Sequence, residues 1–398
     1  MPALTIRESA RVTTAAGVLG SVLGLALATA GCALADGPPG AASDSAGVTL
    51  VRSSDPDRPL AWTAEMTRRL EVPDSTLTAV PWGVAADPAA GRIYALDWTG
   101  ERVAVFDRAG AFVEWIGQRG EGPGEFRNPS ALALDPHGAL HVLDGGRGIV
   151  SRWSPTGELL DEVRAPASYW GPGLAADGAG WTYVVSSEMD VEQRETLVRD
   201  TGGETEELYS LARELVMMDL PCVGRPAARV FAPSVVWATR GDTVYVREGD
   251  GYRIDVLVDG GLVASYRRPL EPIPVTGAMA EARVRMGPYS GVMRACGVTA
   301  ADVVTAVGHE EATSPVFWLA PDPAGRIWVT RSEDGVRPSR VDVLGADGEY
   351  LGTLDLPGIP VAFLSDSVFV GVAPGPLGVT LTRYELRAGP ARAGASNP

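Results

Sequence analysis

The chain alternates apolar and polar residues in short runs that glycine-containing turns separate. Strand-like runs occupy 81–87, 92–97 and 102–107, and a fourth follows Gly110. The segment from Pro129 repeats the whole pattern at an offset of 47 or 48 residues. Four short strands in a unit of this length are typical of one blade of a β-propeller.

Four weaker copies of this unit follow. They begin near Pro172, Pro233, Pro315 and Pro360. The last copy ends after Leu386, before a fourth strand, and strand-like apolar positions between 60 and 72 precede the first copy. We therefore predict an all-β fold, a six-bladed β-propeller with four-stranded blades over residues 59–390. The N-terminal strand would close the ring, because an open blade would leave strand edges unpaired.

Two insertions interrupt the blades, at 217–231 and at about 269–314. The second breaks the β pattern, and its spacing predicts short helices at Gly277–Met286 and Thr299–Val307. Thr299 begins a sequence with capping-box spacing. Because function usually resides in loops that a rigid scaffold carries, we expect the functional face to bear these insertions.

The segment before the first insertion fits two structures. Apolar residues between 208 and 216 have helical spacing. The repeat instead predicts a strand at Glu207–Leu211, after the Gly202-Gly203 turn. We adopt the strand, with a short helix after it.

The N-terminus has the layout of a secretory signal over residues 1–31. Two arginines precede the uncharged apolar run 12–30. Thr29–Cys32 resembles a bacterial lipobox, which would leave Cys32 lipidated at the new N-terminus. The alternative is cleavage after Ala33-Leu34-Ala35, which would release a protein without a lipid.

The segments that flank the predicted propeller are polar or rich in small residues. Residues 32–58 contain a Gly-, Pro-, Ala- and Ser-rich stretch, which predicts a flexible tether. Residues 391–398 are predicted to be a disordered tail.

The composition narrows the range of partners. The chain has 48 glycines and 31 prolines, which suits many short strands joined by turns. Its net charge is −16, and every basic residue is an arginine. A protein this acidic repels phosphate backbones and anionic lipids. We therefore expect no nucleic-acid partner, and we expect the protein to contact a membrane only through an N-terminal lipid.

The three cysteines fit an exported protein. If Cys32 carries the lipid, Cys222 and Cys296 form an even pair, which predicts a disulfide in an oxidising compartment. Two separate buried thiols are the alternative. Such a disulfide would join the two insertions into a cap over one face.

One stretch carries a resemblance to a known family. Ile116–Phe126, followed by Pro129 and by Leu140–Asp144, resembles the NHL repeat, and the match extends over residues 79–160. The chain is similar in particular to bacterial six-bladed propeller lipoproteins of this type. The resemblance implies that the glycine-rich stretch links consecutive blades, with Phe126 as its anchor.

The sequence favours a role without catalysis. Lactonase-like propellers hold a metal ion with carboxylate, Asn and His ligands. Here the three histidines, His137, His141 and His309, have no ligand-like spacing, and the only asparagines are Asn128 and Asn397. No GxSxG motif occurs. We therefore predict no catalytic residue and no metal ligand, and the cofactor is left open.

Two aspartates end equivalent strands of the first two blades. Asp97 and Asp144 would form a carboxylate ring at the channel mouth if they point inward. The structural alternative is that each accepts hydrogen bonds from its own turn and pairs with a nearby arginine, Arg102 or Arg147.

Most of the ten tryptophans occupy strand positions typical of packing between blades. Trp98 and Trp170 lie instead in loops. Together with Arg147, they are our candidate ligand-binding residues.

These observations favour an exported propeller that acts as a binding or scaffolding module for a protein or cell-envelope ligand. It would be an envelope lipoprotein, or a periplasmic or secreted protein if the lipid is absent. One alternative is a metal-dependent hydrolase or lyase that uses the central channel. Another is a carbohydrate-binding envelope protein, which would need aromatic side chains exposed on one face.

Overall fold

The computed structural model describes most of the chain from residue 41 onward. The described residues are 41–43, 48–73, 77, 79–165, 169–189, 191–287, 289–356, 358–375 and 378–388. They belong to one compact unit, Gly40–Pro398. The predicted signal at 1–31, Cys32 and the predicted tail at 391–398 lie outside the described residues.

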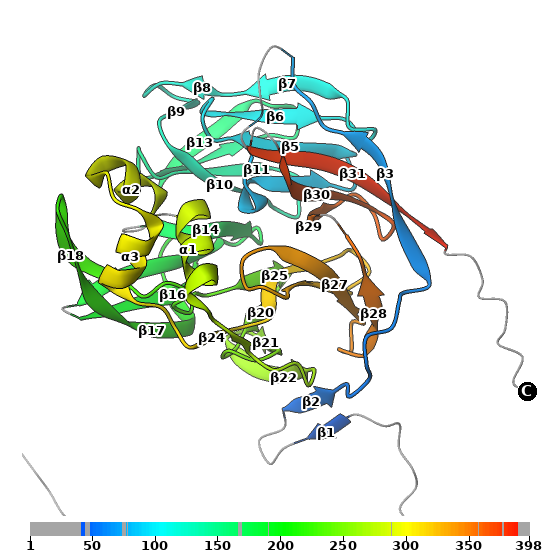
Figure 1. Cartoon of the computed structure of the whole chain (residues 1–398). Helices are drawn as coiled ribbons and strands as arrows, with labels where there is room; N and C mark the ends of the chain where they lie inside the picture. Colours follow the sequence, from blue (N-terminus) through cyan, green and yellow to red (C-terminus); the bar gives the residue numbers. More distant parts are fainter. Residues whose placement is uncertain are drawn as a thin grey trace, which may run out of the picture. The chain divides into compact units, whose positions relative to one another are not determined.

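Six antiparallel sheets form the blades (Figure 1). The first blade contains β4 (Val84–Asp87), β5 (Arg92–Asp97), β6 (Arg102–Phe106) and β7 (Phe112–Ile116). The second contains β10 (Pro129–Leu134), β11 (Leu140–Asp144), β12 (Ile149–Trp153) and β13 (Leu159–Arg164). The third contains β14 (Tyr169–Ala176), β15 (Trp181–Met189), β16 (Glu192–Asp200), β17 (Thr205–Leu220) and the added β18 (Val223–Ala228).

The other three blades follow the same order of strands. The fourth contains β19 (Trp237–Arg240), β20 (Thr243–Arg247), β21 (Arg253–Val258) and β22 (Gly261–Arg267). The fifth contains β25 (Val316–Pro321), β26 (Ile327–Ser332), β27 (Pro338–Leu344) and β28 (Tyr350–Leu354). The sixth contains β29 (Ile359–Phe363), β30 (Val368–Gly375), β31 (Gly378–Ala388) and, from the N-terminal side, β3 (Trp62–Arg69).

The fold is a six-bladed β-propeller, as predicted. The first strands of neighbouring blades contact one another: β10 contacts β14, and β29 contacts β4. The sixth blade is completed by β3, which pairs antiparallel with β31 in a register that places Met66 opposite Tyr384. The predicted closure by an N-terminal strand is therefore confirmed.

Apolar side chains fill the spaces between neighbouring blades. Leu96 and Val103 of the first blade pack in one buried cluster with Leu140 and Val142 of the second. Because a blade is covered on both faces, its middle strands bury consecutive residues, as β11 does over its whole length. This packing explains why few polar positions interrupt those strands.

The glycine-rich linker between the first two blades is held by its own short ladder. β8 (Gln118–Arg119) pairs parallel with β9 (Glu125–Phe126). The Phe126 ring is fully buried, and its centroid lies 6.1 Å from that of Trp153. Gly117 has a φ of +69°, and a Cβ there would overlap the Phe126 ring. Only glycine fits both conditions.

The predicted tether at residues 32–58 is wrong where the structure describes it. β2 (Thr49–Arg52) pairs parallel with β22, so it extends the fourth blade, and β1 (Ala41–Ser43) pairs with β2 (Figure 1). The segment Thr-Leu-Val is rich in residues that favour strands, and β22 offers it an open edge. Composition gave no sign of this pairing because the partner strand lies more than 200 residues away.

A buried ion network holds the chain after β2 against the fourth and fifth blades. Asp342 is fully buried, and its Oδ2 lies 2.5 Å from Nη1 of Arg268. Asp57 accepts hydrogen bonds from Nη2 of Arg268 at 3.0 Å and from Nη2 of Arg331 at 2.6 Å. The Arg268 guanidinium also stacks 3.8 Å from the centroid of Tyr350. Burial alone would raise the pKa of Asp57, but the two arginines hold it below its ordinary value.

The first insertion is a β-hairpin. β17 continues unbroken to Leu220 and pairs with β18 in a register that places Leu215 opposite Ala228. The predicted strand at Glu207–Leu211 is therefore confirmed, and the short helix after it is wrong. Strand pairing along both β16 and β18 outweighs the helical spacing of the apolar residues.

The second insertion contains three helices between β23 (Ile273–Pro274) and β24 (Ala312–Thr313). The helix α1 (Gly277–Met286) has the predicted bounds. The helix α3 (Ala300–Val307) has Thr299 as its N-cap, and both hydrogen bonds of the predicted capping box are present. The helix α2 (Ser290–Cys296) was not predicted.

Among the described helices, none is long and apolar enough by itself to cross a membrane. Taken together, α2 and α3 have the length and composition, but the chain bends by 108° between them.

Candidate functional site

The propeller topology places several loops on one face. In an antiparallel blade, the turn between the second and third strands lies at the same end as the connection to the next blade. The turn that carries Trp98, the linker at 117–128 and both insertions are loops of these two kinds. A hydrogen bond of 3.3 Å from Nε1 of Trp98 to Oδ1 of Asn128 joins the Trp98 turn to the linker.

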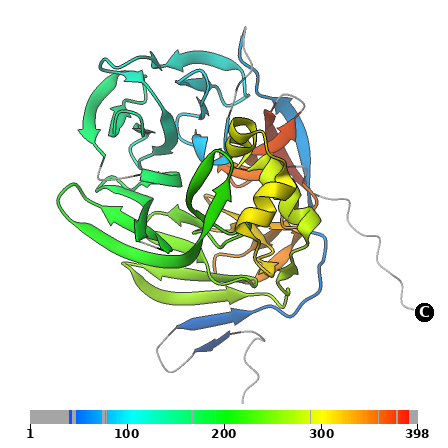
Figure 2. The same cartoon turned by 60° about the vertical axis from the view of Figure 1, so that its left-hand side comes forward.

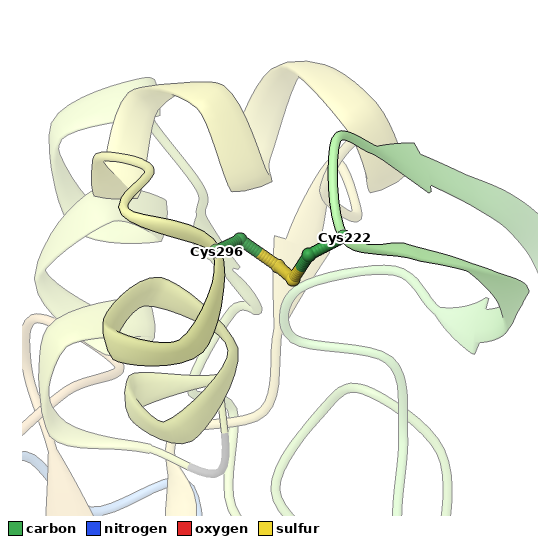
Figure 3. The surroundings of a disulfide bond; sticks show 2 residues. All are labelled: Cys222 and Cys296. Carbon is green, nitrogen blue, oxygen red and sulfur yellow. A yellow bond between two sulfur atoms is a disulfide. The ribbon is translucent and has the colours of Figure 1, made fainter.

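The two insertions form a cap that a disulfide holds together. Cys222 lies in the turn between β17 and β18, Cys296 ends α2, and their Cα atoms are 5.1 Å apart (Figure 3). The helices lie beside the hairpin in both overall views (Figures 1 and 2). Met218, Val284 and Val303 are buried in the shared apolar core of this cap. The predicted disulfide is therefore present, and it links the two insertions.

A cavity of about 2080 Å³ lies between this cap and the first strands of the blades. Its walls include residues of β14, β19 and β25, and its roof includes residues of β17, β18, α1 and α2. This volume exceeds the roughly 300–1,000 Å³ of a pocket for one small molecule. The cavity can therefore hold an extended ligand.

Four tryptophans line the cavity. They are Trp82 in the 3-10 turn η1 (Pro81–Gly83), Trp98, Trp237 in β19 and Trp318 in β25. The Trp98 side chain is 51% exposed, and the hydrogen bond to Asn128 fixes the edge of its ring. The face of this indole is thus available to a ligand.

The cavity lining contains six arginines and five carboxylates. The arginines are Arg213, Arg225, Arg229, Arg247, Arg283 and Arg294. The carboxylates are Glu188, Glu248, Asp250, Glu310 and Glu311. The whole chain has 50 acidic residues against 34 basic ones, so the lining is more basic than the protein as a whole.

Some of these charges are already paired. Nη2 of Arg213 lies 2.7 Å from Oε1 of Glu195, and its Nε donates to Gln193. Oε2 of Glu248 accepts a hydrogen bond of 2.8 Å from the hydroxyl of Tyr209. Burial raises the pKa of Tyr209, and the hydrogen bond to Glu248 raises it further.

Other arginines of the lining have no carboxylate partner. The side chains of Arg225, Arg283 and Arg294 form no hydrogen bond or ion pair with any residue that the structure describes. The partly buried Arg247 donates to the carbonyl oxygens of Ser234 and Val316, at 2.5 and 3.3 Å, and its buried Nε has no partner among the described residues. Burial lowers the pKa of Arg247, whereas the side chains of Arg225, Arg283 and Arg294 are exposed to solvent.

Among the predicted ligand-binding residues, only Trp98 lines the cavity. Arg147 donates to both carboxylate oxygens of Glu162, at 2.8 and 3.1 Å, and to the carbonyl oxygen of Glu125. The Arg147 guanidinium thus holds the linker against β13, and ligand binding by Arg147 stays a prediction. The side chain of Trp170 lies outside the described residues.

Asp97 and Asp144 have the structural role that the sequence allowed as an alternative to a carboxylate ring. Asp144 is fully buried and accepts hydrogen bonds from the backbone of four residues: Arg127, Asn128, Gly146 and Arg147. Asp97 lies 3.5 Å from Nε of Arg102. Neither lines the cavity.

The buried histidine lies between two blades. Nδ1 of His141 accepts a hydrogen bond of 2.9 Å from Trp181, and Nε2 lies 3.4 Å from Asp135. Burial lowers the pKa of His141. Within the part of the chain that the structure describes, no three His, Cys, Asp or Glu side chains are grouped as metal ligands.

Sequence reasoning missed the arginines of the cavity. Arg225, Arg283 and Arg294 are spread over about 70 residues, and no motif connects them. Their positions in the two insertions were the only available signal, because the disulfide between those insertions was predicted.

A family model supports the fold. The model DUF5128, described as a 6-bladed beta-propeller, matches residues 70–214. No curated protein matches this sequence.

Several solved structures have a similar fold. One is a protein of Bacteroides fragilis whose name calls it exported, with 12% identity and a TM-score of 0.47; the match covers 86% of this chain and 99% of that one. A DUF4221-family protein of Bacteroides vulgatus has 10% identity, coverage of 82% and 99%, and a TM-score of 0.47. A gluconolactonase of Xanthomonas campestris has 14% identity, coverage of 85% and 99%, and a TM-score of 0.43.

Proposed function

We propose that this protein is an exported binding module of the cell envelope and that its ligand occupies the capped cavity. The N-terminal signal supports export, and the lipobox-like sequence at Cys32 supports a lipid anchor. The linker at 116–126 supports an NHL-type propeller within the six-bladed class.

One observation carries the proposal: a covalently closed cap stands over a cavity large enough for an extended ligand. The disulfide joins two insertions that the propeller does not need for its ring. Ordering such a cap costs conformational entropy, which the disulfide and the apolar core of the cap offset. A large concave site with a few polar groups is the usual form of a binding site.

The aromatic lining favours a carbohydrate ligand over a protein ligand. Indole faces stack on the C–H faces of sugar rings, and Trp98 offers such a face inside the cavity. A ligand of several sugar units also fits the volume.

Co-sedimentation with a cell-envelope fraction tests the proposal. The mature protein should sediment with the fraction, and Trp98→Ala should reduce the bound amount at least fivefold. Val113→Ala on β7 is the matched control, because Val113 is comparably exposed but lies outside the cavity. Equal binding of wild type and Trp98→Ala would show that the cavity is not the binding site.

A further inference from the structure

We infer that the Cys222–Cys296 disulfide is a redox switch: a dithiol reductant opens the bond, and α2 then unwinds from the roof of the cavity. This inference rests on the proposed function and adds the regulation of the same site. The disulfide joins the turn between β17 and β18 to the last residue of α2 (Figure 3). Ser290, Gly291 and Arg294 of α2 line the cavity, so the roof is complete only while this helix is folded.

The first argument is the position of the disulfide at the surface. Cys222 is exposed and Cys296 is partly buried, so the thiolate of a reductant meets the sulfur of Cys222 first. Cys222 lies in the turn at the tip of the hairpin, where Pro221 and Gly224 are exposed as well. Thiol–disulfide exchange requires such access, and exposed disulfides are the ones that reductants open most readily. The bond can therefore be reduced while the protein is folded.

The second argument is that α2 depends on the disulfide more than the other two helices do. The helix α1 buries two residues in the apolar core of the cap and α3 buries three, whereas α2 buries none. Val292 and Met293 of α2 are only partly buried against this core. No side chain of α2 forms a hydrogen bond or an ion pair with any residue that the structure describes. The disulfide is therefore the strongest link between α2 and the rest of the cap.

The third argument is the length of α2. It has seven residues, and an isolated helix of fewer than about 12 residues is marginal in water. Gly291 within it lowers its intrinsic stability further. Tyr289, which precedes α2, stays bound to the hairpin, because its hydroxyl donates a hydrogen bond of 2.6 Å to the carbonyl oxygen of Ala228. Loss of the disulfide should thus unwind α2 in place and leave α1 and α3 folded.

The switching reaction is a thiol–disulfide exchange in two steps. A thiolate of the reductant attacks the sulfur of Cys222, which forms a mixed disulfide and releases the thiolate of Cys296. The second thiol of the reductant then attacks the mixed disulfide, so the reductant leaves as a disulfide and Cys222 is released. The two protons of the reductant end on the two cysteines, and two electrons pass to the protein. A disulfide oxidant reverses both steps and closes the cap again.

Hydrogen exchange of the mature protein, measured by mass spectrometry with and without dithiothreitol, tests the inference and needs no ligand. Dithiothreitol should reduce the disulfide of the folded protein without denaturant, which adds about 2 Da to its mass. Exchange in α2 should then become at least tenfold faster, because its amides lose their helical hydrogen bonds. The helices α1 and α3 and the blade strands should keep their rates, because their own apolar contacts hold them.

The Cys222→Ser/Cys296→Ser variant is the matched control. It should exchange like the reduced wild type, and dithiothreitol should not change it. Unchanged exchange in α2 after complete reduction would overturn the inference. An equal rise in all three helices would overturn it too, since it would mean that the disulfide holds the whole cap rather than α2. A disulfide that dithiothreitol reduces only in the presence of denaturant would have the same consequence.

Co-sedimentation with the cell-envelope fraction tests the link between α2 and the cavity. The double variant, which needs no reductant, should bind at least fivefold less than the wild type, because the unwound α2 no longer completes the roof. If exchange in α2 rises but the bound amount is unchanged, the inference is overturned, while Trp98→Ala still decides whether the cavity is the binding site. If neither protein sediments, the proposed function fails, and hydrogen exchange still decides whether reduction unwinds α2.

Discussion

Removal of the Cys222–Cys296 disulfide should destabilise the protein by an amount that follows from its position. The two cysteines are 74 residues apart in the sequence. The entropy of closing a loop of this length in the unfolded chain corresponds to about 4.5 kcal/mol at 25 °C. Residual structure in the unfolded state reduces this value, so we expect the Cys222→Ser/Cys296→Ser variant to lose about 4 kcal/mol in the free energy of unfolding.

Urea denaturation of wild type and the double variant measures this loss. The midpoint should fall and the slope should rise somewhat, because the unfolded chain without the disulfide is less compact and exposes more surface. Reductant added to the wild type should reproduce the shift, and it should have no effect on the double variant, which serves as its control. A loss below about 1 kcal/mol would refute the reasoning, since it would mean that the cap is held by its apolar contacts alone.

Three further predictions concern the propeller itself. Asp342→Ala should lower the free energy of unfolding by about 3–5 kcal/mol in urea denaturation, because it removes the buried carboxylate between two buried arginines and leaves only the partly exposed Asp57 to balance both; a loss under 1 kcal/mol would contradict the network. In the folded protein the pKa of Asp57 is below its ordinary value of 3.8. Asp57 therefore contributes its full share of the free energy of unfolding above about pH 3.8, and this share is lost as the pH falls through the folded-state pKa. Asp57→Asn should therefore flatten the decline in the urea midpoint below about pH 4, and an unchanged slope would contradict this. Gly117→Ala should cost about 3 kcal/mol by calorimetry or urea, since its φ is positive and its Cβ would meet Phe126; a neutral result would show that the linker shifts freely.

Periodicity predicted the parts of the fold that depend on local pattern. The offset between the first two units fixed the blade length, and the incomplete last unit indicated that the N-terminal strand closes the ring. The helices α1 and α3 could be found because glycine turns and the Thr299 cap delimit them.

Pairings between distant segments could not be predicted in the same way. Thr49–Arg52 reads as part of a linker until the open edge of β22 is known. Likewise, β17 has helical spacing, and only its two neighbouring strands show why it stays extended.

The candidate site was predicted in outline only. The disulfide between the insertions and the exposed Trp98 were visible in the sequence, because cysteine parity and loop position are local features. The arginines of the cavity could not be predicted, since Arg225 and Arg283 line the same cavity only after the hairpin and the helices fold over the blades. The ion pair of Arg147 with Glu162 could not be assigned from spacing, because Glu162 lies on β13, beyond the next turn of the same blade.

The most direct test of the central claim is hydrogen exchange of the mature protein, measured with and without soluble glycan fragments of the cell envelope. If the capped cavity is the binding site, ligand should slow exchange in the hairpin at 217–228, in α1 and around Trp98, and leave the outer strands β7 and β13 unchanged. Slower exchange confined to the outer strands, with no change in the cap, would contradict the account.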